Sequence, residues 1–338
     1  MVDNQIHTPG MNSGSTVVAL CGGIGGAKLA LGLYRVLDPN TLTVIINTGD
    51  DFEHLGLYIS PDIDTVTYTL ADKNNQEAGW GRRDETWNFM AALAELGGET
   101  WFALGDRDLA IHIERSRRLK AAEGLGEITA DISSKFDIAA QLLPMSDDPV
   151  ATTIQTSAGR LTFQDYFVRL KCEPVVEKVF YEEAHSAVPH AEVLASLHQA
   201  DLRCIVICPS NPFLSIDPIL SVPGIRDTMV ASPAPVIGVS PIIDGHAVKG
   251  PTAKMMAELS LPSTAQAVAE HYDELLDGYV IDIADRDNSN EMHIPVRVTR
   301  TLMNSIEDRE NLAREVISFA DSVKASDNNQ ANQVDTAC

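Results

Sequence analysis

The most constraining feature of the sequence is the glycine-rich stretch at residues 17–28, VVALCGGIGGAK. Its apolar start predicts a buried strand, and the apolar residues that follow the glycines recur with the spacing of a helix. A glycine turn between strand and helix lets backbone N–H groups approach a phosphate, and the helix N-terminus adds positive charge. We therefore predict a nucleotide or phosphate site at Gly22, Gly23, Gly25 and Gly26, with a ligand-free tight turn as the alternative.

Two familiar phosphate-binding motifs do not fit this stretch. A Walker A loop requires Ser or Thr after Gly-Lys, but Lys28 follows Ala27 and precedes Leu29. A dinucleotide fingerprint requires a third glycine where Lys28 stands, and an acidic residue at the end of the second strand, where Asn47 stands. An NAD-dependent oxidoreductase is therefore a weak reading of the sequence.

Composition sets the broad class of protein. The chain of 338 residues has 44% hydrophobic and 22% charged residues, which is typical of a globular protein with a large core. Its formal net charge of −23 disfavours nonspecific binding to nucleic acid or to an anionic membrane. The five cysteines lack metal-ligand spacing, and neither a signal peptide nor a membrane span is apparent, so a cytoplasmic location is expected.

Strand and helix patterns alternate along the chain. Strands are expected at 16–20, 41–47, 101–104, 202–208, 235–239 and 278–283, with helices between them and a closing helix at about 307–323. This alternation predicts a Rossmann-like, doubly wound α/β fold with a mainly parallel sheet. We expect one domain at 16–323 with a smaller inserted subdomain at about 125–185, and disordered ends at 1–15 and 324–338.

The inserted subdomain and the polar loops complete the sequence-based fold. Residues 142–149 are expected to form a loop, 151–156 and 160–163 a hairpin, and 175–181 another strand. The polar loops CGGIGG, NTGDD, GDRD, PSNP and SPIIDG each follow a predicted strand. Parallel sheets bind ligands at the carboxyl ends of their strands, so these loops should gather around one site.

Carboxylates are concentrated near the glycine turn. Asp50 and Asp51 follow the second strand, and Asp62 and Asp64 open the next expected helix. Beside a phosphate, such a group favours a divalent cation, because magnesium takes oxygen ligands and bridges carboxylates to phosphates. For Asp62 and Asp64 the alternative is a favourable interaction with the helix dipole.

Further side chains are candidates for binding. Arg107 of the GDRD loop is a candidate phosphate clamp, or else part of a structural ion pair. The segment GWGRRDETW, with Trp80 and Arg83, could hold a flat ring, or could be a surface loop with a core tryptophan. Neutral hydrogen bonds to a nucleotide could come from Ser210, Asn211 and Ser240. No nucleophile triad is apparent, which suits transfer at phosphorus.

Taken together, these segments resemble the 2-phospho-L-lactate transferase family of coenzyme F-420 biosynthesis. The matching segments are CGGIGGAK, NTGDDFEHLGLYISPDIDT, GWGRRDETW, LGDRD, LLPMSDDPV, PSNPFLSI and SPIIDGHAVKGP. The resemblance implies a magnesium-dependent enzyme that moves a phosphorylated hydroxy acid from its guanosine diphosphate derivative to 7,8-didemethyl-8-hydroxy-5-deazariboflavin, with release of GMP. It also implies a homodimer.

The resemblance carries roles to individual positions. Asp51 and Asp64 would be catalytic, and Asp50 would join them in holding magnesium. The nucleotide would contact Gly22, Gly23, Gly25, Gly26, Lys28, Asn47, Ser210, Asn211 and Ser240. The deazaflavin would contact Asp62, Trp80, Arg83, Asp106 and Arg107. The donor acid stays open between phospholactate, phosphoenolpyruvate and 3-phosphoglycerate. The main alternative is a nucleotide-sugar-binding regulatory protein of a related glycine-loop family.

Overall fold

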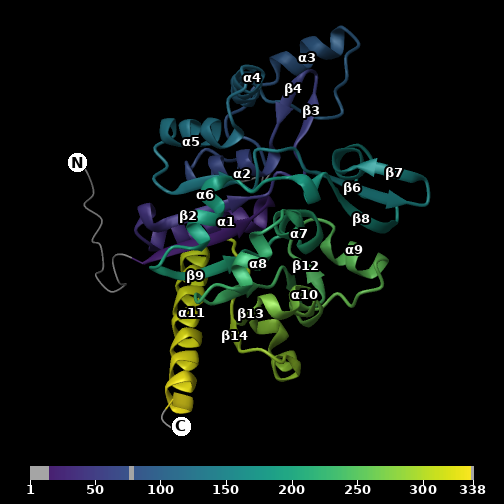
Figure 1. The fold of residues 1–338 in the computed structure, drawn as a ribbon. Helices are drawn as coiled ribbons and strands as arrows, with labels where there is room; N and C mark the ends of the chain where they lie inside the picture. Colours follow the sequence, from purple (N-terminus) through teal and green to yellow (C-terminus); the bar gives the residue numbers. More distant parts are fainter. Residues whose placement is uncertain (1–14, 76–79, 336–338) are drawn as a thin grey trace.

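A seven-stranded parallel sheet forms the centre of the molecule (Figure 1). The structure is a computed structural model and describes residues 15–75 and 80–335. The strands lie in the order β14-β13-β10-β9-β1-β2-β5, and every neighbouring pair is parallel. Their bounds are β1 Thr16–Cys21, β2 Leu42–Ile46, β5 Gln141–Pro144, β9 Leu202–Ile207, β10 Val236–Val239, β13 Gly278–Asp282 and β14 Val296–Thr299. The predicted Rossmann-like, doubly wound α/β fold is confirmed.

The strand order creates a switch point between β1 and β9. From β1 the chain builds outward through β2 to β5, and then returns to the other side of β1 to build β9, β10, β13 and β14. The connections that leave β1 and β9 therefore diverge to opposite sides, which opens a crevice at their carboxyl ends. The glycine stretch follows β1 and the PSNP loop follows β9, so both border this crevice.

Each face of the sheet is covered by its own apolar layer. Because side chains alternate along a strand, Val17 and Ala19 of β1 face one layer while Val18 and Leu20 face the other. The first layer contains α1 Gly23–Val36, α2 Pro61–Leu70 and α11 Ile306–Asp335, and the second contains α6 Ala191–Leu197, α7 Asp217–Ser221, α8 Ile225–Val230, α9 Thr252–Glu258 and α10 Ala265–Tyr272. All six residues of β1 are buried or half-buried, as expected of a central parallel strand.

The inserted subdomain is smaller than the sequence suggested. It is a three-stranded antiparallel sheet of β6 Ala151–Thr156, β7 Gly159–Thr162 and β8 Val176–Glu182, in the order β7-β6-β8. The predicted hairpin and third strand are confirmed. The boundary at about 125 is corrected, because α5 Leu125–Lys135 packs on the main sheet and β5, predicted as loop, is an edge strand of that sheet.

An outer arm stands beside the main sheet and contains the short antiparallel pair β3 Phe52–His54 and β4 Leu57–Ile59, with α3 Asn88–Glu95 and α4 Asp106–Lys120 (Figure 1). The strand predicted at 101–104 is wrong, because these residues have no strand conformation. They pack instead against β3 through the ring of Phe102, which meets Phe52 edge-on at 4.9 Å. The apolar run predicts that these residues are buried. Neighbouring aromatic rings bury them, and no pairing with a strand is needed.

Three further points complete the fold. Strand β14 was not predicted, and its four residues are only half-buried. Helix α11 continues to Asp335, beyond the end expected at 323, so the tail predicted to be disordered from 324 is helical as far as Asp335. The expected lead-in at 1–15 lies outside the described residues except for its last residue. No helix of the described chain is long and apolar enough to cross a bilayer.

Candidate functional site

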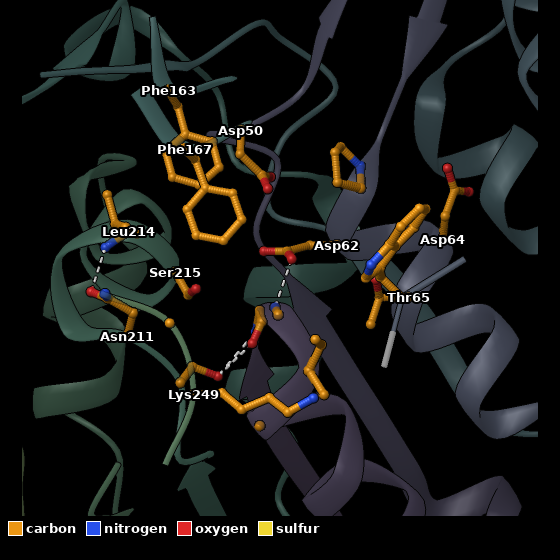
Figure 2. A pocket seen from close by; sticks show the side chains of 18 of the residues that line it. Asp50, Asp62, Asp64, Thr65, Phe163, Phe167, Asn211, Leu214, Ser215 and Lys249 are labelled. Carbon is orange, nitrogen blue, oxygen red and sulfur yellow. Dashed lines mark hydrogen bonds between the residues drawn. The ribbon is translucent and has the colours of Figure 1, made fainter. Parts of the chain in front are cut away.

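A cavity of about 610 Å³ lies at the carboxyl ends of the parallel strands (Figure 2). Its lining comes from loops that are distant in sequence, including the glycine turn after β1, Asp50 after β2, the PSNP loop after β9 and Thr301 after β14. The subdomain adds Phe163 and Phe167, and the outer arm adds aromatic side chains. The predicted gathering of polar loops at one edge is therefore confirmed.

The glycine turn forms the first turn of α1 and is held by its neighbours. Gly22 is the N-cap of α1, and its N–H donates to Ser210 Oγ at 3.2 Å, while the hydroxyl of Ser210 donates to the Gly22 carbonyl at 2.7 Å. The N–H of Gly23 donates to Asp62 Oδ1 at 2.6 Å. The following N–H groups of a first helical turn have no acceptor within the helix. Those of Ile24 and Gly25 lie in the cavity wall, where an anion could accept from them.

Absence of side chains at these glycines is also required by packing. A Cβ on Gly25 would collide with the Pro209 carbonyl, and one on Gly26 would collide with Ser210 Oγ and Cys21 Sγ. Gly26 does not line the cavity, whereas Gly22, Gly23 and Gly25 do. The alternative of a tight turn without a ligand therefore explains why residue 26 is a glycine. At the other three positions, a glycine both allows close packing and keeps the cavity wall open.

Two carboxylates, Asp50 and Asp62, share one amide on the floor of the cavity. Asn47 Nδ2 donates to Asp62 Oδ2 at 2.9 Å and approaches Asp50 Oδ1 at 3.3 Å. Burial raises the pKa of Asp62 to about 6. Burial, followed by the charges of Asp62 and Asp51, also raises the pKa of Asp50. Asn47 lies beneath the cavity rather than in its wall, so the structure gives it the role of holding this carboxylate pair.

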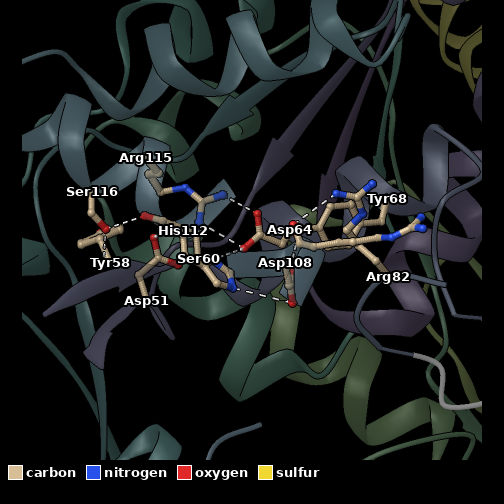
Figure 3. A network of polar contacts seen from close by, with 11 residues as sticks. Asp51, Tyr58, Ser60, Asp64, Tyr68, Arg82, Asp108, His112, Arg115 and Ser116 are labelled. Atoms are coloured by element: carbon tan, nitrogen blue, oxygen red, sulfur yellow. Dashed lines mark hydrogen bonds and ion pairs between the residues drawn. The ribbon is translucent and has the colours of Figure 1, made fainter. Parts of the chain in front are cut away.

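Asp64 belongs to a second polar group, which also borders the cavity, since Asp64, Tyr68, Asp108 and His112 line it (Figure 3). The buried guanidinium of Arg115 donates to both oxygens of Asp64, once at 3.1 Å and once through a shorter bond. His112 lies between two carboxylates, with Nδ1 at 3.6 Å from Asp64 Oδ2 and Nε2 at 3.6 Å from Asp108 Oδ2. The hydroxyl of Tyr68 donates to Asp108 Oδ1. Sequence reasoning missed Arg115 and His112, because an arginine or histidine within a charged helix has no distinguishing pattern.

Asp51 lies in the same polar network as Asp64 and Arg115, and Figure 3 draws it there beside Ser60. Its Oδ2 accepts from the Ser60 hydroxyl at 2.8 Å, and it does not belong to the cavity wall. Burial raises its pKa, although Ser60 and Arg115 oppose that effect. Its catalytic role stays a prediction from the sequence, and Asp62, which lines the cavity, has the more direct access to a bound molecule.

The predicted magnesium ligands do not form one cluster. Within the described residues, no group of three or more His, Cys, Asp or Glu side chains is arranged to hold one metal ion. Asp64 is engaged by Arg115, and Asp51 by Ser60. Asp50 fits a cation better, since it lines the cavity and burial among other carboxylates raises its pKa, which a positive charge would lower. One or two carboxylates with phosphate oxygens and water suit magnesium.

Aromatic side chains form a large part of the cavity lining. Trp80, predicted for deazaflavin binding, lines it together with Trp101 and Phe102 of the outer arm. Phe163 and Phe167, which Figure 2 shows at the end away from Lys249, stack at 5.2 Å with 18° between their planes. Flat rings in the wall are suited to hold a flat ligand.

Three of the other residues predicted for deazaflavin binding have structural partners and lie outside the cavity wall. Arg83 is exposed and pairs with Asp72 at 3.3 Å. Asp106 accepts from the Thr86 hydroxyl at 2.6 Å and from the N–H groups of Asn88 and Phe89, so it fastens the start of α3 to α4. Arg107 is exposed and also lies outside the wall. In the GDRD loop it is the second aspartate, Asp108, that reaches the cavity.

Four further residues predicted for the nucleotide come from both sides of the switch point: Lys28 lies in α1, Ser210 and Asn211 follow β9, and Ser240 follows β10. Lys28, Ser210, Asn211 and Ser240 all line the cavity. Lys28 Nζ donates to the Met303 carbonyl at 2.8 Å. Lys249 lines the same region and had no role assigned from the sequence, although it lies in the segment SPIIDGHAVKGP. A lysine in a polar loop has no spacing that would mark it for binding.

The fold and this cavity define a Rossmann-like α/β protein with a ligand site at the switch point of its sheet. The chain belongs to the 2-phospho-L-lactate transferase CofD family, whose sequence profile matches residues 17–318. It is 42% identical to a phosphoenolpyruvate transferase from Kitasatospora aureofaciens, over 91% of this chain and 98% of that protein. It is 39% identical to a 2-phospho-L-lactate transferase from Methanosarcina acetivorans, over 91% of this chain and 100% of the other.

A solved structure agrees on the fold. A UPF0052-family protein from Bacillus halodurans superposes with a TM-score of 0.62 and 16% identity, covering 91% of this chain and 100% of that one. At this identity the likeness concerns the fold alone. The transferase family and its place in coenzyme F-420 biosynthesis, as the sequence resemblance predicted, rest on the sequence relatives.

Proposed function

We propose that this transferase moves a phosphorylated hydroxy acid from its guanosine diphosphate derivative to the ribityl hydroxyl of 7,8-didemethyl-8-hydroxy-5-deazariboflavin. The supporting observation is one cavity lined by three chemically different groups: lysines, the Asp50–Asp62 pair and aromatic rings. Figure 2 shows Lys249 at one end, Phe163 and Phe167 at the other, and Asp62 between them. An anionic nucleotide fits the lysine end, and a flat acceptor fits the aromatic end. The reacting phosphorus would then lie beside the carboxylates.

The reaction is a displacement at phosphorus. The acceptor hydroxyl oxygen forms a new bond to the phosphorus that carries the hydroxy acid, and the bond from that phosphorus to the bridging oxygen of the diphosphate breaks. The leaving group is GMP, and the hydroxyl proton passes to a carboxylate. Asp62 suits that task, because a base with a pKa of about 6 is unprotonated at neutral pH and still takes a proton readily. The amide of Asn47 donates to both Asp62 and Asp50 and so fixes the orientation of the two carboxylates.

Magnesium is part of this proposal. Asp50 is the residue that would hold it, which leaves Asp62 free to act as the base, and the charge of the ion would lower the repulsion between carboxylates and phosphates. The protein itself contributes the N–H groups of the first turn of α1, which can stabilise charge on the phosphates.

Phosphoenolpyruvate is the donor acid that we propose. Bacterial relatives between 39% and 42% identical are named phosphoenolpyruvate transferases. An archaeal relative named for 2-phospho-L-lactate is also 39% identical, so overall identity separates the two donors poorly. The experiment must therefore offer the donors side by side.

The test is turnover with purified protein, magnesium and deazaflavin, using the guanosine diphosphate derivatives of phosphoenolpyruvate, phospholactate and 3-phosphoglycerate. Product mass identifies the acid that is transferred. We expect the phosphoenolpyruvate derivative to give the highest kcat/KM. Turnover that favours another acid would correct the donor alone. Failure to bind the fluorescent deazaflavin, together with tight binding of a UDP-sugar, would instead favour a regulatory nucleotide-sugar-binding protein.

A further inference from the structure

Three cations meet beside the glycine turn in a chain that is otherwise strongly acidic. Lys28, Lys249 and Arg309 have no ion pair to a carboxylate within the part of the chain that the structure describes. The sequence has 48 acidic and 25 basic side chains, so acidic partners are abundant. A group of unpaired cations in such an acidic chain indicates a binding site for an anionic ligand.

Their proximity is visible in the electrostatics of Lys28. Burial lowers the pKa of its amine, and the charges of Arg309 and Lys249 lower it further. The side chain of Arg309 is buried, and its Nε has no hydrogen-bond partner. Lys28 donates to the Met303 carbonyl, which neutralises no charge. A bound anion would relieve the repulsion among these three groups.

Lys249 differs from the other two because it is exposed and lies on a short loop. Residues 248–251 connect β12 His246–Ala247 to α9, and the whole loop belongs to the cavity wall. Figure 2 shows Lys249 at the opposite end of the cavity from Asp50. In the described residues it makes no hydrogen bond, so its ammonium is free to meet a ligand.

We propose that Lys249, together with Lys28, binds the phosphate that leaves with the nucleotide. This inference rests on the proposed function, and it gives a binding role to a residue that sequence reasoning left unassigned. Lys249 lies at the opposite end of the cavity from Asp50, and Lys28 lies close enough to be affected by the charge of Lys249, so the two lysines suit the leaving phosphate rather than the incoming hydroxyl. Negative charge grows on that phosphate as its bond to the attacked phosphorus breaks, and a lysine there favours the transition state over the ground state.

The test compares nucleotides that differ only in phosphate. Binding of GDP, GMP and guanosine is measured by calorimetry or competition for wild type and for Lys249→Met, at constant ionic strength. We expect the substitution to weaken the binding of GDP and of GMP about tenfold, which is the loss typical of one charged hydrogen bond. The affinity for guanosine should be unchanged. At saturating donor, turnover should fall as well, and Lys249→Arg should recover much of both losses.

Lys254→Met is the matched control. It removes the same charge from α9 next to the loop, but Lys254 pairs with Glu258 and lies outside the cavity wall. Its nucleotide affinities should equal those of wild type. Equal weakening of guanosine, or unchanged GDP binding, in Lys249→Met overturns the inference while the proposed function stands. A wild-type protein that binds no guanine nucleotide overturns both.

Discussion

At the scale of single residues, Gly22 shows how closely packing and chemistry are combined at the site. A Cβ at this position would lie 2.6 Å from Asp62 Oδ2 and 2.6 Å from Ser215 Cβ. We therefore expect Gly22→Ala to displace the Asp62 carboxylate and to lower the free energy of unfolding by ~1–3 kcal/mol, the usual cost of overpacking. Chemical denaturation and turnover measure the two effects.

A second glycine provides the control for that substitution. Gly124 is the N-cap of α5, as Gly22 is of α1, and both have extended backbone angles. Its added Cβ would meet only the flexible carboxylate of Asp147, at 3.1 Å. Gly124→Ala should therefore change stability by less than about 1 kcal/mol and leave turnover intact. Equal losses in the two variants would contradict the steric explanation.

Asp62 carries the next prediction, which concerns pH. Its pKa of about 6 in the folded protein exceeds the usual value of 3.8 for an aspartate. The folded state therefore holds this proton more tightly than the unfolded state, so wild type loses stability as pH rises from about 4 to about 6. Asp62→Asn has no such proton to lose. Its stability relative to wild type should rise over this interval by up to roughly 2–3 kcal/mol.

The same variant tests the role of Asp62 as base. Turnover of Asp62→Asn should fall at least ~100-fold, the lower range for loss of a general base. Thermal unfolding followed from pH 4.5 to 7.5 measures the stability change, and product formation measures turnover. A variant that is active, or whose stability follows the same pH profile as wild type, would show that the raised pKa belongs elsewhere in the Asp50–Asp62 pair.

At the scale of elements, Arg115 joins helices α2 and α4 behind the cavity. Arg115→Met would leave Asp64 as a buried charge without compensation, which costs ~3–5 kcal/mol of the free energy of unfolding. Arg117→Met, on the same helix, removes an exposed pair with Glu114 and should cost less than ~1 kcal/mol. Denaturant unfolding of both variants gives the comparison.

A double variant separates charge from packing at this position. Asp64→Asn combined with Arg115→Met removes both charges and should be more stable than Arg115→Met alone. If the double variant is the less stable of the two, packing of the Arg115 side chain, rather than the uncompensated carboxylate, explains the loss.

The elements also show which parts of the site the sequence could predict. The glycine turn, the PSNP loop and Asp62 follow directly after strands or open a helix, and local sequence places them at the carboxyl edge of the sheet. The GDRD loop was harder, because Asp106 caps α3 while Asp108, two positions on, reaches the cavity. Which of two neighbouring aspartates points inward depends on the helix rotation, which only tertiary packing determines.

At the scale of the whole molecule, alternation of strands and helices was enough to predict a parallel sheet with helices on both faces. The strand order could not be predicted from the sequence, because no local sequence pattern shows that the chain returns to pair β9 with β1. For the same reason, the cation group of Lys28, Lys249 and Arg309 was not predicted, since it unites residues from three distant parts of the chain. Long-range pairing therefore decides both the switch point and the charge pattern of the cavity.

Net charge gives the last prediction, which concerns ionic strength. A formal charge of −23 at pH 7 makes the folded chain repel itself, and salt screens that repulsion over a Debye length that falls from ~30 Å at 0.01 M to ~8 Å at 0.15 M. The midpoint of thermal unfolding should therefore rise by about 2–5 °C between 10 and 150 mM NaCl at pH 7, which corresponds to relief of about 1 kcal/mol. Near pH 5, close to the sequence pI of about 4.6, the net charge is small and the rise should largely disappear. Calorimetry at both pH values tests this, and an equal rise at pH 5 would indicate that salt acts through local ion pairs or hydration instead of the charge of the whole molecule.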